Sequence, residues 1–493
     1  MSSNQKSNFK SRRRAIHLLK RVRGSGAVMP RFALAAIVVC ALALVGCAGF
    51  PIGDARAQVP KNIVIVFADG VAATQWDFGR YSSNVLRRQP FVTTDLFRDE
   101  GIGMLISSPH GVYVTDSAAA GSAMATGYKA ENGVLSITPD GKPVRTVMQA
   151  AKAKGKRIGL VSTAAIYDAT PAAFSMNAKS RRASQELVDG YLALEPDVLL
   201  GGGADFFFPE GVSGGKRKDG KDIVAAFRSR GWQVVSNTAE LKAATGSRVI
   251  GLFAVKDMGF DIESDRAREP TMAEMTAGAL KALSKENPDG FVLLVENGNT
   301  DTAGHANDAA ALMRALWATD DAVKVALDFR RSSPETLVIV TGDHETGGLS
   351  PTYALEELAS RSGSNRFVVG DAQIKMLAPI TISLTTAAKK LGSKPSAETL
   401  DAMVAKHFPG FKLDADLRES ILERKPLERN HGHVVPNALG RMVARQTGIY
   451  WGTGGHTSEP VLVGAVGPGS ERFRGYRDNT DFGKSLHRLI EAR

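Results

Sequence analysis

Residues 62–69 read NIVIVFAD, a short apolar run that ends in a carboxylate. A run of this length that is rich in Val and Ile is typical of a strand buried on both faces of a parallel sheet. Four more runs share the pattern: IGLVST at 158–163, FVLLVE at 291–296, TLVIVT at 336–341 and VLVGAV at 461–466. We interpret all five as strands of one parallel sheet.

Helical patterns separate these strands, most clearly at 146–154, 271–284, 306–329 and 482–491. Strands that alternate with helices predict an α/β fold, here a three-layer α/β/α sandwich with a mostly parallel central sheet. Residues 351–450 interrupt the alternation with mixed helix signals at 396–406 and 436–448. We predict that this stretch is an insertion that caps the site.

The composition is ordinary for a globular enzyme and argues against a nucleic-acid partner. The chain has 493 residues, of which 43% are hydrophobic and 23% charged, with a formal net charge of +11. Nine basic residues and no acidic residue lie in 1–46, so the rest of the chain carries 53 basic against 51 acidic residues. The basicity therefore belongs to the amino-terminal leader and not to a binding face.

The leader has the features of an export signal. Residues 32–45 form an apolar run that follows basic residues and is too short to span a membrane. The run ends in Leu44-Val45-Gly46-Cys47, which resembles the lipobox of bacterial lipoproteins. We predict that residues 1–46 are a signal peptide with a lipobox, that Cys47 carries the lipid, and that 47–60 form a tether.

Three details qualify this prediction. A plain secretory signal with an incidental cysteine remains the alternative, and translation starting at Met29 would give a more compact signal. Ala48 follows the cysteine where an acidic residue would retain a lipoprotein at the inner membrane, so the pattern points to the outer membrane. The only cysteines are Cys40 and Cys47, so the folded part has neither a disulfide nor a thiolate metal site.

Carboxylates and imidazoles follow three of the predicted strands. Ligands of open α/β sheets bind at the carboxyl ends of strands, where the loops diverge. A single Asp after a strand is usually a helix cap, but three clusters at one edge are harder to explain that way. The residues are Asp69, Glu296, Asp301, His305, Asp343 and His344.

The spacing of these residues suits metal ions. Asp301 and His305 are four residues apart and would share one face of a helix, although a capping Asp and a solvated His give the same pattern. Asp343 and His344 are adjacent in a glycine-rich loop, and His456 lies in a second one, GTGGHT at 452–457. Oxygen and imidazole ligands without sulfur favour Zn²⁺ or another divalent ion.

Residues 114–121 read VTDSAAAG, which places Ser117 among small residues where a helix begins. Backbone N–H groups at such a position bind phosphate, although a capping serine on a buried alanine-rich helix fits the same letters. Thr170 lies in DATPAA at 168–173, and Arg181 follows it by eleven residues. An arginine fork suits phosphate oxygens.

Taken together, these blocks resemble the alkaline phosphatase family. The resemblance covers about 62–493, apart from 351–450, and its motifs occur in the family's order. No single block is specific, but the ordered set is. The blocks are FADG (67–70), VTDSAAAGSAMATG (114–127), STAAIYDATPAAF (162–174), VENGNTDTAGH (295–305), VTGDHETGG (340–348) and GTGGHTSEPV (452–461).

The resemblance implies hydrolysis of small phosphate monoesters at a site with two zinc ions and one magnesium ion. It implies that Ser117 is the nucleophile and becomes phosphorylated, and that Arg181 and Asp168 bind the substrate. The family is often dimeric, which implies a possible homodimer. The implied metal ligands are Asp301, His305 and His456 for the first zinc, Asp69, Asp343 and His344 for the second, and Asp69, Thr170 and Glu296 for magnesium.

One departure and two rival functions remain. Thr302 stands where other members have Lys or His, so phosphate affinity and pH optimum do not follow from the resemblance. A phosphodiesterase or related hydrolase of the same superfamily is the first rival, although the setting of Ser117 lacks the C/S-x-P-x-R pattern of sulfatases. A non-catalytic phosphate-binding lipoprotein is the second.

Overall fold

The computed structural model describes residues 59–355 and 366–492. By its internal contacts the chain divides into Met1–Arg56 and Ala57–Arg493, and only the second unit falls within the described residues. The predicted signal peptide, Cys47 and nearly all of the predicted tether lie outside them. Within the described ranges, no helix combines the length and the apolar character that a membrane crossing needs.

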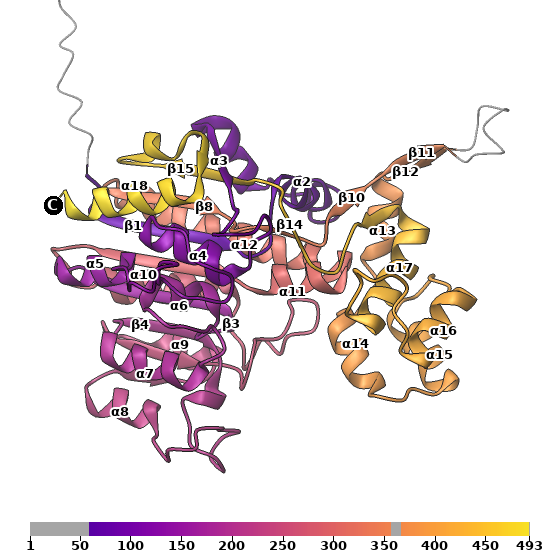
Figure 1. Cartoon of the computed structure of the whole chain (residues 1–493), viewed down its shortest axis with the longest axis horizontal. Coiled ribbons are helices and arrows are strands. Elements are labelled where there is room, and N and C mark those ends of the chain that lie inside the picture. The colour runs from indigo at the N-terminus through magenta and orange to yellow at the C-terminus, as the bar shows by residue number, and fades with distance from the viewer. Residues whose placement is uncertain (1–58, 356–365, 493) are drawn as a thin grey trace, which may run out of the picture. The chain divides into compact units, whose positions relative to one another are not determined.

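A ten-stranded sheet forms the centre of the second unit, in the order β16-β2-β15-β8-β1-β7-β3-β4-β6-β5 (Figure 1). All of its pairings are parallel except those of β15, which runs antiparallel to both β8 and β2. The strands are β1 Asn62–Ala68, β2 Ile102–Ile106, β3 Arg157–Ala165, β4 Val198–Gly202, β5 Gln233–Val235, β6 Val249–Leu252, β7 Phe291–Asn297, β8 Thr336–Thr341, β15 Val461–Val466 and β16 Gly475–Asp478.

The predicted strands all belong to this sheet, and the α/β class with its mostly parallel sheet is confirmed. One detail of the prediction is wrong, because Val461–Val466 (β15) is antiparallel to its neighbours. Its apolar run indicates that the strand is buried on both faces, but burial does not depend on the direction in which the strand runs.

Helices cover both faces of the sheet, as the alternating side chains of β1 show. Val64 and Val66 belong to one hydrophobic core, and Ile63 and Ile65 belong to another on the opposite face. Helices α10 and α12 pack on the first face, while α4, α5, α6 and α18 form the layer on the second. The helices are α2 Ala73–Ser82, α3 Val92–Glu100, α4 Ser117–Thr126, α5 Val147–Ala153, α6 Ala169–Ser175, α7 Ser184–Leu194, α8 Ile223–Ser229, α9 Thr238–Ala243, α10 Met272–Ser284, α11 Asn299–Ala306, α12 Ala309–Ser332 and α18 Asn479–Glu491.

The predicted helix at 306–329 corresponds to α12, which begins at Ala309, while Ala306 is the last residue of the preceding helix α11. Asn307 adopts a left-handed backbone with φ of 58° and ends α11. Asp308 then caps α12, since its side chain accepts a hydrogen bond from the Ala311 amide. Helix α11, which ends at this turn, carries Asp301 and His305.

Residues 351–450 contain the helices α13 to α17, which form a separate group to the right of the sheet in Figure 1. The chain enters this group through β10 (Leu349–Pro351) and returns through β13 (Ile449–Trp451), which pairs antiparallel with β10. Helices α14 and α17 contact α11, so the group lies next to the helix that carries Asp301. Its elements are β11 Tyr353–Leu355, β12 Arg366–Val368, α13 Asp371–Leu377, α14 Leu384–Leu391, α15 Ala397–His407, α16 Ala415–Glu423 and α17 Val434–Thr447.

Candidate active site

Three adjacent parallel strands deliver the predicted ligands to one edge of the sheet. Strand β1 lies between β7 and β8, and Phe67 is level with Glu296 of β7 and with Thr341 of β8. Asp69 therefore emerges beside the loops that carry Asp343 and the start of α11. The convergence predicted from the three apolar runs is what the structure has.

The first group of ligand-type atoms comes from Asp69, Asp343 and His344, which each offer one atom within 4.8 Å of the others. His344 Nε2 lies 3.5 Å from Asp69 Oδ1 and 3.3 Å from Asp343 Oδ2. Both of these oxygens are buried and have no hydrogen-bond partner among the described residues. Buried carboxylate oxygens without donors are suited to a cation.

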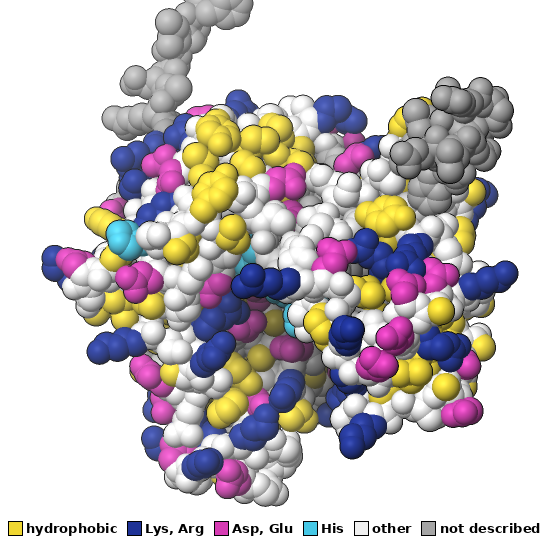
Figure 2. All heavy atoms as spheres, turned by 45° about the vertical axis from the view of Figure 1, so that its right-hand side comes forward, with side chains coloured by type: hydrophobic (Ala, Val, Ile, Leu, Met, Phe, Trp, Pro, Cys, Tyr) yellow, Lys and Arg dark blue, Asp and Glu magenta, His cyan; other side chains and the backbone are white. Residues whose placement is uncertain are grey.

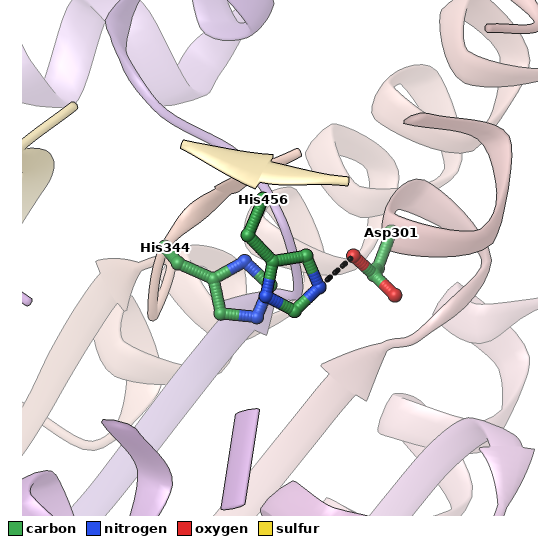
Figure 3. A group of neighbouring side chains, drawn as sticks. All are labelled: Asp301, His344 and His456. Atoms are coloured by element: carbon green, nitrogen blue, oxygen red, sulfur yellow. Dashed lines mark ion pairs between the residues drawn. The ribbon is translucent and has the colours of Figure 1, made fainter. Parts of the chain in front are cut away.

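The second group comes from Asp301, His344 and His456, whose ligand-type atoms also lie within 4.8 Å of one another (Figure 3). The ring of His456 stacks on that of His344, with centroids 3.7 Å apart, and its Nε2 lies 3.6 Å from Asp301 Oδ1. His344 therefore belongs to both groups, which its sequence position does not reveal. His305 adjoins this group, with Nε2 3.3 Å from Asp301 Oδ2.

Hydrogen bonds to backbone carbonyls determine the tautomers of two histidines. Nδ1 of His305 donates to the carbonyl of Gly454 and Nδ1 of His456 donates to that of Thr115, both at 2.8 Å. In the neutral rings, Nε2 is then the unprotonated nitrogen. These two Nε2 atoms face each other at 3.1 Å, where two lone pairs repel unless a proton or a metal ion lies between them.

Thr346 connects the two groups through one hydroxyl. Its Oγ1 donates to Asp301 Oδ1 at 2.5 Å and lies 3.2 Å from His344 Nδ1, from which it accepts a hydrogen bond. This arrangement leaves His344 Nε2 unprotonated and turned toward the carboxylates of Asp69 and Asp343. Sequence reasoning missed Thr346, although it lies in the quoted block VTGDHETGG.

Burial and crowding shift the carboxyl groups of Asp69, Asp343 and Glu296 strongly toward their protonated forms. Burial, followed by the charge of Asp343, raises the pKa of Asp69 well above its ordinary value. Burial also raises the pKa of Asp343 to about 7 and that of Glu296 to about 8. So many buried acids at one point are a feature of sites that hold cations.

Glu296 and Thr170, the other predicted magnesium ligands, lie near these groups without belonging to either. Glu296 is buried at the end of β7, and its charge contributes to the raised pKa of Asp69. It accepts a hydrogen bond from the Ser162 hydroxyl, a partner that sequence reasoning missed. Thr170 Oγ1 is buried in α6 and lacks a hydrogen-bond partner within the described ranges.

Ser117 is the first residue of α4 and is 2% exposed. Asp116 caps the helix, because its carboxylate accepts a hydrogen bond from the Ala119 amide at 2.9 Å. Ser117 Oγ lies 3.1 Å from His344 Nε2, the imidazole shared by both ligand groups. The hydroxyl thus lies at a helix N-terminus and beside the ligand-type atoms, as predicted.

Arg181 reaches the same place from the segment after α6. Its guanidinium contacts Asp116 Oδ2 at 3.3 Å and Asp168 Oδ1 at 3.1 Å. Burial lowers the pKa of Arg181, but the negative charges of Asp168 and Asp116 have a larger effect and raise that pKa. The guanidinium therefore stays charged. Figure 2 shows acidic and basic side chains around a hollow in which histidine is visible.

Comparison with known proteins identifies the family. The sequence model of the alkaline phosphatase family matches residues 60–492. The chain belongs to the alkaline phosphatase family. It is 30% identical to alkaline phosphatase 3 of Bacillus subtilis, over 94% of this chain and 97% of that one. It is also 30% identical to the repressible alkaline phosphatase of Saccharomyces cerevisiae, over 87% and 81% of the two chains.

The fold agrees with that of a solved relative. The crystal structure of the Thermus thermophilus alkaline phosphatase superposes with a TM-score of 0.79 at 28% identity, over 90% of this chain and 96% of that one. Family membership makes this chain an enzyme that hydrolyses phosphate monoesters, as the sequence blocks predicted. The two groups of ligand-type residues agree with a metal-dependent reaction.

Proposed function

We propose that this enzyme hydrolyses phosphate monoesters through a phosphoserine on Ser117, at a site for two zinc ions and one magnesium ion. The position of Ser117 carries the proposal: its Oγ lies at the N-terminus of α4 and 3.1 Å from the shared imidazole of His344. Amides at a helix N-terminus favour the anionic phosphate.

The described donor set fits these metal ions. The fit rests on the unpartnered oxygens of Asp69 and Asp343 and on the opposed Nε2 atoms of His305 and His456. When bound, the ions lower the pKa of the serine hydroxyl and neutralise the charge that develops on the ester oxygen. We assign Asp301, His305 and His456 to one zinc, Asp69, Asp343 and His344 to the other, and Asp69, Thr170 and Glu296 to magnesium.

The chain's own groups then carry out a two-step transfer. Ser117 Oγ forms a bond to phosphorus while the bond to the ester oxygen breaks and the alcohol leaves. Water next attacks phosphorus, which restores the serine and releases inorganic phosphate. Arg181 binds two non-bridging oxygens, and Asp116 and Asp168 hold its guanidinium in place.

The rival function is hydrolysis of diesters by the same groups. Turnover of a phosphate monoester and of a diester, measured across pH on protein of known zinc and magnesium content, separates the two. We expect the monoester to be hydrolysed much faster, because its second negative charge interacts with both Arg181 and the metal ions. Faster turnover of the diester would overturn the proposal.

Arg181→Ala is expected to weaken inhibition by inorganic phosphate and to slow monoester turnover. Two charge-assisted hydrogen bonds are lost, each worth roughly 1.5–3 kcal/mol, so kcat/KM should fall by at least about a hundredfold. The loss on a diester should be smaller, since a diester offers one charge fewer.

Lys179→Ala is the control, because Lys179 is an exposed basic residue near Arg181 in sequence, outside the cavity that Arg181 lines and without an ion pair among the described residues. It should leave the phosphate inhibition constant close to that of the wild type. Equal losses on both substrates in Arg181→Ala would contradict the assigned role.

We also propose that the enzyme is exported and anchored to the outer membrane by a lipid on Cys47. The lipobox-like Leu44-Val45-Gly46-Cys47 supports this, and it lies outside the described residues. Cys47→Ser should move the protein from the membrane fraction to the soluble fraction or stall its processing. Cys40→Ser, a change within the preceding apolar run, should leave the protein in the membrane fraction. A mature protein that begins at another residue and carries no lipid would refute the proposal.

A further inference from the structure

A cavity of about 550 Å³ is lined by Arg181, Tyr167 and Phe206. Asp116 and Asp168, which hold Arg181, form part of its wall. Its volume falls within the roughly 300–1,000 Å³ of small-molecule sites. A monoester with its phosphate on Arg181 has this space available for its alcohol portion.

Two aromatic rings form one wall of this cavity. Tyr167 and Phe206 meet edge to face, with centroids 5.4 Å apart and planes at 87°. Tyr167 directly precedes Asp168, so the aromatic wall begins one residue from the contact with Arg181. Gly203 lies against the tyrosine ring, and a Cβ added there would be 2.8 Å from Tyr167 Cε1.

Buried charged groups hold these rings in position. Asp205 is 1% exposed and accepts hydrogen bonds from the Tyr167 hydroxyl at 2.5 Å and from Lys216 Nζ at 2.8 Å. Arg217 is also buried, and its guanidinium donates to the backbone carbonyl of Phe206 at 3.2 Å. Asp205 and Lys216 also line the cavity, whereas Arg217 supports Phe206 from outside its lining.

The polar rim completes the chemistry of the cavity. Lys256 is exposed at its edge and has no ion pair among the described residues. The face of either ring, beside such a donor, is suited to a planar ring that carries polar atoms, as a nucleobase does. Arg181, which we propose binds the phosphate, lines the same cavity as the two rings. A nucleoside 5′-monophosphate could therefore place its phosphate on Arg181 and its base on the rings.

We propose that Tyr167 and Phe206 form a subsite for the planar ring of the substrate's alcohol portion, so that nucleoside monophosphates are preferred substrates. The proposal rests on the proposed function, since it takes Arg181 as the phosphate-binding arm. Phe206 determines specificity and takes no part in bond making or breaking.

The test compares adenosine 5′-monophosphate with ribose 5-phosphate, which differ only in the base and share a primary alkyl ester. Phe206→Leu keeps an apolar side chain but removes the ring. We expect it to lower the ratio of the two kcat/KM values roughly fivefold, the size of one aromatic contact. The change should appear in KM for the nucleotide, with kcat nearly unchanged.

Two further variants serve as controls. Phe206→Tyr keeps the ring and should retain the wild-type ratio, and Phe208→Leu makes the same replacement outside this cavity and should also retain it. Turnover of ribose 5-phosphate reports in each variant that the protein is folded. An unchanged ratio in Phe206→Leu, or an equal loss on both esters, would overturn the subsite.

Calorimetric binding of adenosine, which has no phosphate, separates this proposal from the proposed function. Wild-type protein should bind adenosine more tightly than Phe206→Leu does, whether or not Ser117 is the nucleophile. Equal affinity would refute the subsite and leave the assignment of Ser117 standing. Absence of monoester turnover together with ring-dependent adenosine binding would refute the proposed function and leave the subsite standing.

Discussion

Ser117→Ala is expected to lower monoester turnover by at least about a thousandfold, because it removes the atom that bonds to phosphorus. Fold and metal content should stay close to those of the wild type. The replaced hydroxyl is a single atom at the start of α4, and Asp116 still caps that helix through Ala119. Residual turnover should come from direct attack of water on the bound ester.

The measurement is an acid quench with labelled phosphate, followed by identification of the labelled residue. Wild-type protein should carry the label on Ser117, and Ser117→Ala should carry none. Ser122→Ala is the control within the same helix. Its hydroxyl donates to the Ala118 carbonyl and accepts from the Ser136 amide, so about 1–3 kcal/mol of stability is lost but labelling continues. Label on a different residue, or near-normal turnover of Ser117→Ala, would show that the mechanism is wrong.

Removal of the metal ions by a chelator should abolish turnover and make stability fall as pH rises. Without metal, the pKa of Glu296 is about 8 and that of Asp343 about 7, because both carboxyl groups are buried. In the unfolded chain such groups titrate near pH 4. The folded protein therefore binds these protons more tightly, and their contribution to stability is full below pH 4 and lost as pH rises through 7–8.

Thermal unfolding of chelated protein between pH 5 and 9 checks this prediction. We expect the Tm to decrease over that interval, and reloading with zinc and magnesium to remove most of the decrease. Glu296→Gln removes one of the titrating groups, so the chelated variant should show a shallower decrease. A Tm of chelated protein that is independent of pH, or turnover that survives chelation, would contradict the assigned ligands.

Much of the fold was predictable because a few short runs carry strong signals. The run at 62–67 and its four counterparts are strands because continuous Val and Ile indicate burial on both faces. The direction of β15 was not predictable, since the same letters serve a parallel or an antiparallel strand. The start of α12 was predicted at Ala306 and lies at Ala309, because a single left-handed residue, Asn307, hardly disturbs an apolar helical pattern.

The site was predictable as a set of residue types, but not as a network. Aspartate and histidine stand out after strands, so the principal ligand-type residues were found. Thr346 and Ser162 were not, because hydroxyl residues are common and their partners Asp301 and Glu296 are distant in sequence. That His344 serves both groups depends on its stacking against His456, which no local pattern encodes.

The return path of the chain after α17 has an evolutionary consequence. Strand β10 pairs with β13, and just inside them β9 (Glu345–Thr346) pairs with β14 (His456–Thr457). The β10–β13 ladder brings the ends of the intervening stretch together before His456 is reached, and the β9–β14 ladder holds His456 itself. The part of this stretch that contacts neither α11 nor the 452–454 loop can therefore lengthen, shorten or be exchanged among descendants without displacing His456. Asn430 and Asn437, which hydrogen-bond to Gly452 and His305, belong instead to the constant catalytic frame.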